Sequence, residues 1–245
     1  MKKYLAEGLV IFASIFASFS VENIRQDSIE KDILNEAVIT LGDEIESNIE
    51  YTKEHLKQVE NMLYLTNELL NRYDEIKLTN LYEIHSNNPF IYNIINNGEL
   101  EYIKKYNDQY NIMSYWNAWE PEDVFFQSML YSGKLLEIKN KKLRKEIESI
   151  YTKQEERISG MTLLTKDRTE RIFEWFETER NKYDRDIPNS ELFSIHKNQK
   201  LKNLINLCRG NLEARVSDLE NYLQALNNVV LLISSAYLDA RAIFV

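Results

Sequence analysis

The residue types that most often carry catalysis or bind metals are few in this chain, and their spacing supports neither role. Three histidines, His55, His85 and His196, lie far apart, and none belongs to a His-Glu-x-x-His motif or a similar histidine and carboxylate pair. Ser132-Gly133 lacks the Gly-x-Ser-x-Gly context of a hydrolase nucleophile. The six glycines are too scattered to form a phosphate-binding loop. We therefore expect no catalytic residue, no metal ligand, no cofactor and no enzymatic activity.

The charge and the cysteine count exclude further classes of function. The net charge of −9 disfavours a nucleic acid partner, because phosphate binding requires a basic surface. Cys208 is the single cysteine, which excludes an internal disulfide and a thiolate metal cluster. We expect a buried thiol, and an intermolecular disulfide is the alternative if the body lies outside the cytoplasm.

The acidic residue with the most unusual setting is Glu7, which lies within the apolar stretch from Leu5 to Val21. As a helix this stretch would cover roughly 25 Å, slightly less than the ~30 Å hydrocarbon core of a bilayer. Lys2 and Lys3 precede it, which favours a cytoplasmic N-terminus with the body on the other side. The stretch predicts a transmembrane helix. A cleaved signal peptide is the alternative, with small residues at 18–20 as the cleavage site.

Small residues recur at four-residue steps in this stretch, as Ala13 with Ala17 and Ser14 with Ser18. Such spacing lets two helices approach closely in lipid and so predicts self-association. Glu7 falls on the same helical face as both serines. Its carboxylate would either face the interior of a bundle or a pore mouth, or pair with Lys3 at the headgroups. We therefore expect these five residues to form an oligomer and membrane interface.

The rest of the chain predicts an all-α fold, because six glycines and three prolines leave room for long helices. Apolar residues from position 28 to about 75 recur at steps of three, four or seven, which indicates a coiled-coil-like helix that is able to continue from the span. Two more long amphipathic helices are expected, from 141 to about 183 and from about 191 to the C-terminus. The predicted organisation is an anchor helix (1–25), a long helix (26–76), a small helical cap region (77–138) and two long helices completing a bundle (139–245).

The region between the first two long helices is rich in Asn, Tyr and Ile and has turn residues at 86–89 and 96–98, so we expect short helices. One of them should start at Pro121 and end near Tyr131, with Gly133 in the left-handed conformation. Asn140 should cap the helix that follows. Tyr115, Trp116 and Trp119 cluster before Pro121. They would form either a patch for a protein partner or part of the packed core.

Two parts of the sequence resemble a family of single-span membrane proteins of Bacteroidota, whose function is unknown. That family carries Gly-Glu, an Ile/Val-rich span and Asn-Trp, to which Ala6-Glu7, residues 9–21 and Asn23-Ile24 are similar. Its downstream Ser-Gly-x-Leu, Ile-x-Asn and Leu-Arg signature resembles residues 132–135, 138–140 and 143–144. The missing Gly before Glu7 and the missing Trp after Asn23 depart from it. The resemblance implies a single-span membrane protein of a bacterium, and it implies no activity. Together with the lysine bias, we expect a single-pass protein of the bacterial inner membrane with a periplasmic body.

These observations predict a membrane-anchored helical scaffold or interaction protein that assembles with copies of itself. Its expected partners are membrane lipid, a second copy of the chain and an unidentified protein. The alternative is an oligomeric ion channel or membrane effector, with a pore formed by the N-terminal helix and Glu7 near its mouth.

Overall fold

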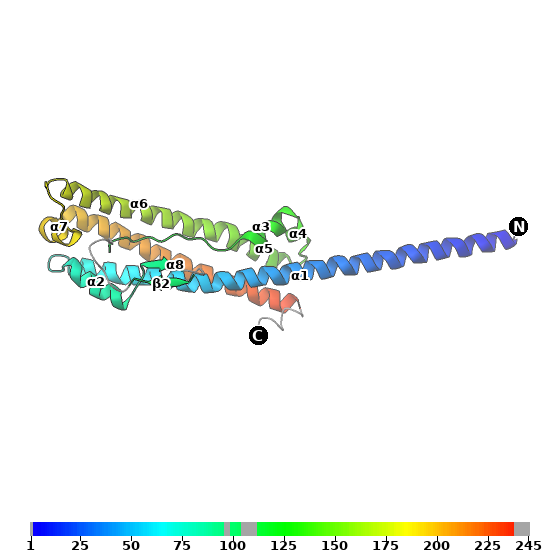
Figure 1. Cartoon of the computed structure of the whole chain (residues 1–245). Helices are drawn as coiled ribbons and strands as arrows, with labels where there is room; N and C mark the ends of the chain where they lie inside the picture. The colour runs from blue at the N-terminus through cyan, green and yellow to red at the C-terminus, as the bar shows by residue number, and fades with distance from the viewer. Residues whose placement is uncertain (1, 96–98, 104–111, 238–245) are drawn as a thin grey trace.

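The computed structural model describes the backbone of residues 2–95, 99–103 and 112–237, together with their side chains except those of residues 2–13, 15, 17 and 94. Three long helices dominate it: α1 (Lys2–Asn71), α6 (Glu155–Arg180) and α8 (Gln199–Ala236). Figure 1 shows the second half of α1 lying alongside α6 and α8, while the first half projects alone from the bundle. The predicted all-α class is confirmed, since the described residues are mostly helical.

Helix α8 is the centre of the bundle and packs against both α1 and α6. Its buried residues recur at steps of three or four along one side, which is the pattern of a helix held between two partners. These buried residues include Leu201, Ile205, Cys208, Leu212, Leu219, Leu226, Val229 and Ile233. The thiol of Cys208 is therefore part of the core, as expected.

The first half of α1 makes a single unbroken helix with the half that enters the bundle. Full burial of its described side chains begins at Ala37, whereas Phe16, Phe19, Val21 and Ile24 are each about two-thirds exposed. Within the part of the chain that the structure describes, no helix combines the length and the apolar character needed to cross a membrane. The side chains of Glu7, Ala13 and Ala17 lie outside the described residues.

The region expected to be a helical cap combines short helices with extended segments in its described part. Helix α2 (Leu78–Asn87) is followed by β1 (Tyr92–Ile94), which pairs antiparallel with β2 (Leu100–Tyr102). Residues 112–123, which we call the strap, contain no helix or strand. In Figure 1 the strap runs along the bundle toward α3 rather than closing its end. The prediction of short helices before residue 121 is confirmed by α2 but is wrong for the strap, where side chains of α1 pair with the backbone of Glu120 and Glu122 in place of internal hydrogen bonds.

Two features predicted from the sequence between the strap and α6 are confirmed. Helix α3 (Val124–Tyr131) ends before Gly133, whose φ of 78° is the expected left-handed conformation. After α4 (Lys134–Glu137), the Asn140 side chain accepts hydrogen bonds from two backbone N–H groups of α5 (Lys141–Ser149), both at 3.1 Å. The α3 start at Val124 lies three residues after the predicted one.

The second and third long helices are each interrupted once. One turn of π-helix, η2 (Ile150–Gln154), joins α5 to α6. The third helix was expected to be continuous from about 191, but α7 (Asn189–His196) and α8 are separated by Lys197 and Asn198. The backbone of Asn198 is extended, and its side chain accepts a hydrogen bond from the N–H of Leu201 at 3.1 Å. A new N-cap therefore starts α8.

Substituting glycines by alanine should change stability in opposite directions at two kinds of site. Gly133→Ala is expected to lower the free energy of unfolding by about 1 kcal/mol, because alanine is strained at positive φ. Gly160→Ala and Gly210→Ala lie inside α6 and α8 with nothing within 4 Å of an added Cβ, so each should raise it by up to ~1 kcal/mol. Urea unfolding followed by circular dichroism measures all three. A destabilised Gly210→Ala variant would contradict this account.

Candidate functional site

The strap is held on α1 by side chains that substitute for a neighbouring strand. The amide of Asn48 makes a pair of hydrogen bonds with the backbone of Glu122: Nδ2 donates to the carbonyl at 2.7 Å and Oδ1 accepts from the N–H at 2.8 Å. One turn further, the Tyr51 hydroxyl accepts from the N–H of Glu120 at 2.9 Å. These contacts satisfy backbone groups that an isolated extended segment would leave unpaired.

Glu44 fixes the end of the strap where α3 begins. Its buried carboxylate accepts hydrogen bonds from the N–H groups of Phe125 at 2.6 Å and Phe126 at 3.2 Å. It also accepts from the hydroxyl of Tyr151 at 2.8 Å. Asp123, which precedes α3, makes no side-chain cap. Glu44 therefore supplies the missing N-cap from another helix, where its negative charge is favoured by the helix dipole.

The middle of the strap lies on a buried polar network centred on Arg215 of α8. The guanidinium Nη2 donates to Oδ1 of Asn117 at 3.1 Å and lies 3.0 Å from Nε2 of His55. The amide of Asn117 in turn donates to Oε1 of Gln58. Arg215 has no exposed surface. A single guanidinium therefore joins α1, the strap and α8.

This guanidinium has no counterion in the described part of the chain, where no carboxylate lies within 4 Å of it. Burial lowers the pKa of Arg215 only to about 10, so it remains charged at neutral pH. Burial, and then the adjacent guanidinium, lower the pKa of His55 to about 3. His55 is therefore neutral and able to accept the Arg215 hydrogen bond through Nε2. Buried charges are normally paired, so the arrangement is costly.

The α1 residues involved in these contacts form one line, which we call the polar seam and define as Glu44, Asn48, Tyr51, His55 and Gln58. They follow one another at steps of four, three, four and three, and therefore share a helix face. These residues were not predicted to form a site, because polar residues at this spacing usually form a solvated helix face. One feature of the sequence could have indicated them. Residues 116–123 lack helical periodicity, and an extended segment needs polar side chains nearby to pair with its backbone.

A half-buried carboxyl group, that of Glu155, follows the π-helical turn. Glu155 accepts a hydrogen bond from the hydroxyl of Tyr222 at 3.1 Å. Burial raises the pKa of Glu155 to about 7, the Tyr222 hydrogen bond opposes this rise, and the nearby charges of Asp123 and Glu44 add to it. Its protonation therefore changes near neutral pH.

The three aromatic residues predicted as a partner patch occupy different environments. Tyr115 is fully buried and Trp119 is 8% exposed, so both belong to the core. The Trp119 ring lies 5.0 Å from the ring of His55 and 5.5 Å from that of Tyr222. Only Trp116 is half-exposed, and the Lys166 ammonium lies 4.7 Å from the centre of its ring. Of the three residues, Tyr115 and Trp119 are therefore core residues, and Trp116 is partly exposed.

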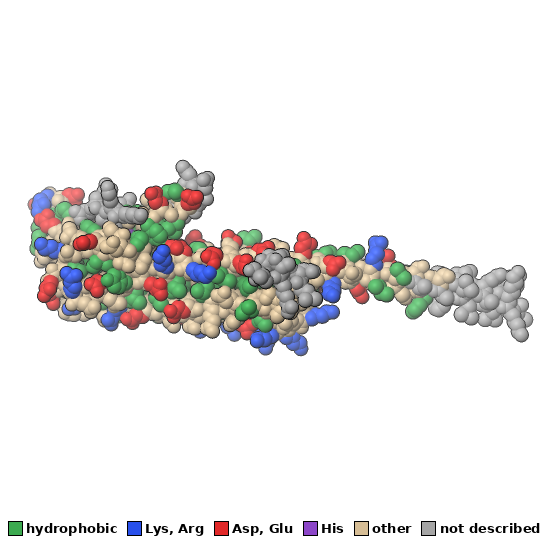
Figure 2. All heavy atoms as spheres, turned by 90° about the horizontal axis from the view of Figure 1, so that it is seen from below, with side chains coloured by type: hydrophobic (Ala, Val, Ile, Leu, Met, Phe, Trp, Pro, Cys, Tyr) green, Lys and Arg blue, Asp and Glu red, His purple; other side chains and the backbone are tan. Residues whose placement is uncertain are grey.

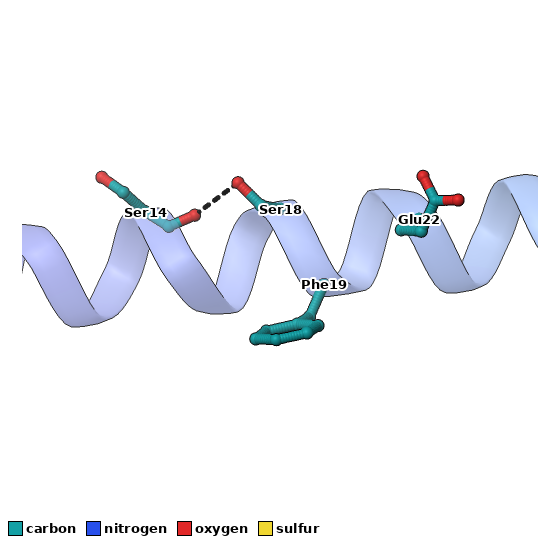
Figure 3. A pocket seen from close by; sticks show the side chains of 4 residues that line it. All are labelled: Ser14, Ser18, Phe19 and Glu22. Atoms are coloured by element: carbon teal, nitrogen blue, oxygen red, sulfur yellow. Dashed lines mark hydrogen bonds between the residues drawn. The ribbon is translucent and has the colours of Figure 1, made fainter.

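The described part of the predicted N-terminal interface lies on the projecting half of α1. Ser14, Ser18 and Glu22 share one face, and Phe19 points away from it (Figure 3). The hydroxyl of Ser18 donates to the carbonyl of Ser14 at 2.9 Å. One helix supplies only one wall here, so the Ser14 and Ser18 face would need a second helix to become a binding site.

The three histidines have structural partners. Nε2 of His85 accepts from the N–H groups of Phe90 and Ile91, which holds the chain after α2. Nδ1 of His196 lies 3.2 Å from the carboxylate of Glu179. Among the described residues no group of His, Cys, Asp or Glu side chains is arranged to hold a metal ion.

Comparison with known proteins assigns neither a family nor a function to the chain. No protein-family model matches the chain, and no curated protein or solved structure matches it either.

Replacing Glu44 tests whether it holds the strap. Glu44→Ala should lower the free energy of unfolding by roughly 2–4 kcal/mol, because it leaves buried N–H and hydroxyl donors without an acceptor. Glu50→Ala on the exposed face of the same helix is the matched control and should cost less than about 1 kcal/mol. Urea titration gives both values, and equal losses in the two variants would refute the role of Glu44.

Glu155 predicts a specific pH dependence of stability. Its folded-state pKa near 7 exceeds the ordinary value of 4.5, so the folded protein retains this proton to higher pH than the unfolded chain does. The resulting stabilisation is fully present below pH 4.5 and is lost as the pH rises through 7. Glu155→Gln should therefore gain stability relative to wild type between pH 5 and pH 8, measured by urea titration, whereas the exposed control Glu156→Gln should show no such trend.

Proposed function

We propose that this protein is a membrane-anchored helical scaffold that assembles through the projecting half of α1 and holds its bundle away from the bilayer. The observation that carries the proposal is the exposure of Phe16, Phe19, Val21 and Ile24 at 66%, 67%, 65% and 70%. Figure 2 shows apolar side chains at the surface of this part of the helix. Exposed apolar residues in series are favourable only in lipid or against another helix.

The sequence before these residues supports lipid as the environment. Residues 5–21 form an almost uninterrupted apolar stretch preceded by Lys2 and Lys3, and the backbone is helical throughout. The lysines favour a cytoplasmic N-terminus, and the bundle would then be periplasmic in a bacterial inner membrane. The resemblance to single-span membrane proteins supports the same arrangement.

Assembly follows from the small residues on the same helix. Ser14 and Ser18 present two small side chains one turn apart on the same face, and the Ser18 hydroxyl donates to the carbonyl of Ser14. Two copies of α1 can therefore approach closely without burying an unpaired hydroxyl. Between Glu22 and Leu34 the helix would cover roughly 18 Å, which separates the bundle from the membrane surface. The bundle is then the part of the protein that is available to a partner.

The anchor is tested by comparing the full chain with one that begins at Glu22. The full chain should pellet with phospholipid vesicles, resist extraction at alkaline pH and migrate as an oligomer in mild detergent. The shortened chain should stay in the supernatant as a monomer, because it lacks residues 5–21. Circular dichroism provides the control: the thermal unfolding of both chains should agree, since burial of the described α1 side chains begins well after Glu22.

Two results would overturn the proposal. A full chain that remains soluble and monomeric without detergent would exclude both the anchor and the assembly. A full chain that forms a soluble oligomer without vesicles would assign the exposed residues to helix pairing and would exclude the anchor.

A further inference from the structure

Three side chains form a line of hydrogen bonds at the turn between α6 and α7, at the end of the bundle far from the projecting half of α1 (Figure 1). The hydroxyl of Tyr183 lies 2.6 Å from Nε2 of His196, and Nδ1 of the same ring lies 3.2 Å from a carboxylate oxygen of Glu179. A hydroxyl, an imidazole and a carboxylate in this order are the arrangement of a nucleophile, a base and the group that orients the base. The proposed anchor and assembly make no use of these residues.

The carboxylate of Glu179 fixes the direction of both hydrogen bonds. An ionised carboxylate can only accept, so Nδ1 of His196 carries the proton that it donates to Glu179. In a neutral ring protonated at Nδ1, Nε2 can only accept, so the Tyr183 hydroxyl is the donor. The phenolic proton therefore already points at the atom that would take it up. His196 is placed as a general base for Tyr183.

The turn that carries Tyr183 is fixed by its neighbours. Arg180, the last residue of α6, donates to the carbonyl of Ile187 at 3.4 Å across the turn. Glu179 is buried, whereas Tyr183 and His196 are partly exposed. The group that orients the base thus lies in the interior, and the line of hydrogen bonds runs from it toward the surface.

The charges around the turn favour an uncharged reactant at Tyr183. The cations Lys182 and Arg185 already pair with Glu179 and Glu191, each at 2.6 Å. Residues 184–186 add two further carboxylates. A phosphoryl donor carries several negative charges, so it would meet repulsion here rather than a free cationic site. The reacting carbon of a neutral ester meets no such repulsion.

We propose that Tyr183 is a site of covalent acylation, at which the phenolic oxygen takes an acyl group from an uncharged, activated ester. The Tyr183 oxygen forms a bond to the acyl carbon as its proton passes to Nε2 of His196, and the bond from that carbon to the alcohol oxygen of the ester breaks. Glu179 pairs with the imidazolium that results. His196 then gives the proton to the departing oxygen, so the products are an ester of Tyr183 and a free alcohol.

The probe is p-nitrophenyl acetate, and the full chain in detergent contains its own reference residue. Tyr131 is 86% exposed and is therefore more accessible to the reagent than the partly exposed Tyr183. Mass spectrometry of proteolytic peptides should nevertheless find acetylation of Tyr183 to be at least about tenfold faster than that of Tyr131, because only Tyr183 has a general base. The fully buried Tyr115 should stay unmodified and reports whether each variant is folded.

His196→Gln should lower the rate at Tyr183 to that at Tyr131 or below, because an amide cannot take up the proton. Glu179→Gln should also lower it, because it removes the charge that pairs with the imidazolium. Glu177→Gln is the matched control, since it makes the same change on an exposed face of the same helix, and it should leave the rate unchanged.

Three results would overturn the proposal: a wild-type rate at Tyr183 no higher than that at Tyr131, stable acetylation of His196 in place of Tyr183, or equal effects of Glu179→Gln and Glu177→Gln in folded protein. The first two are measured on the wild-type chain and so do not require any variant to fold. None of these results depends on whether the chain inserts in a membrane.

Discussion

The strap is a segment without helix or strand that packs within a helical bundle, and its backbone groups must find hydrogen-bond partners there. Each residue of the strap carries a backbone donor and acceptor, except where proline removes the donor, and burial of these groups is unfavourable unless they are paired. The polar seam of α1 provides the pairing through Asn48, Tyr51 and Glu44, whose side chains bind the backbone of Glu122, Glu120 and the start of α3. Because the strap occupies space between α1 and α6, α8 becomes the helix that contacts both.

The same requirement explains the buried charge. Asn117 needs a donor for its carbonyl and an acceptor for its amide, and Arg215 and Gln58 supply them. A guanidinium can reach across from α8 to the strap while its Nη2 also meets His55. The cost is a buried cation surrounded by neutral groups. Burial, and then this cation, lower the pKa of His55 and keep it unprotonated. A local solution to hydrogen bonding thus creates a positive electrostatic potential behind Trp119.

Much of the helical framework could be predicted from the sequence, because its determinants are local. Gly133 and Asn140 act through the backbone of their immediate neighbours, and the buried positions of α8, including Cys208, follow helical periodicity. The strap could not be predicted, since its conformation is stabilised by residues about seventy positions earlier. The residues of the polar seam have the same spacing as those of a solvated helix face. Only the location of the strap shows that this face is covered. Glu179, Tyr183 and His196 meet across the turn between α6 and α7, and no sequence pattern links their positions.

Helix α1 extends over 70 residues without a break, which corresponds to roughly 105 Å. The exposed tip and the polar seam therefore belong to one stiff rod and share one rotational setting. Turning this rod by a single residue step of about 100° would direct Asn48 and Tyr51 away from the strap. The contacts of the polar seam with the strap consequently also fix which face the projecting half of α1 turns outward in each direction.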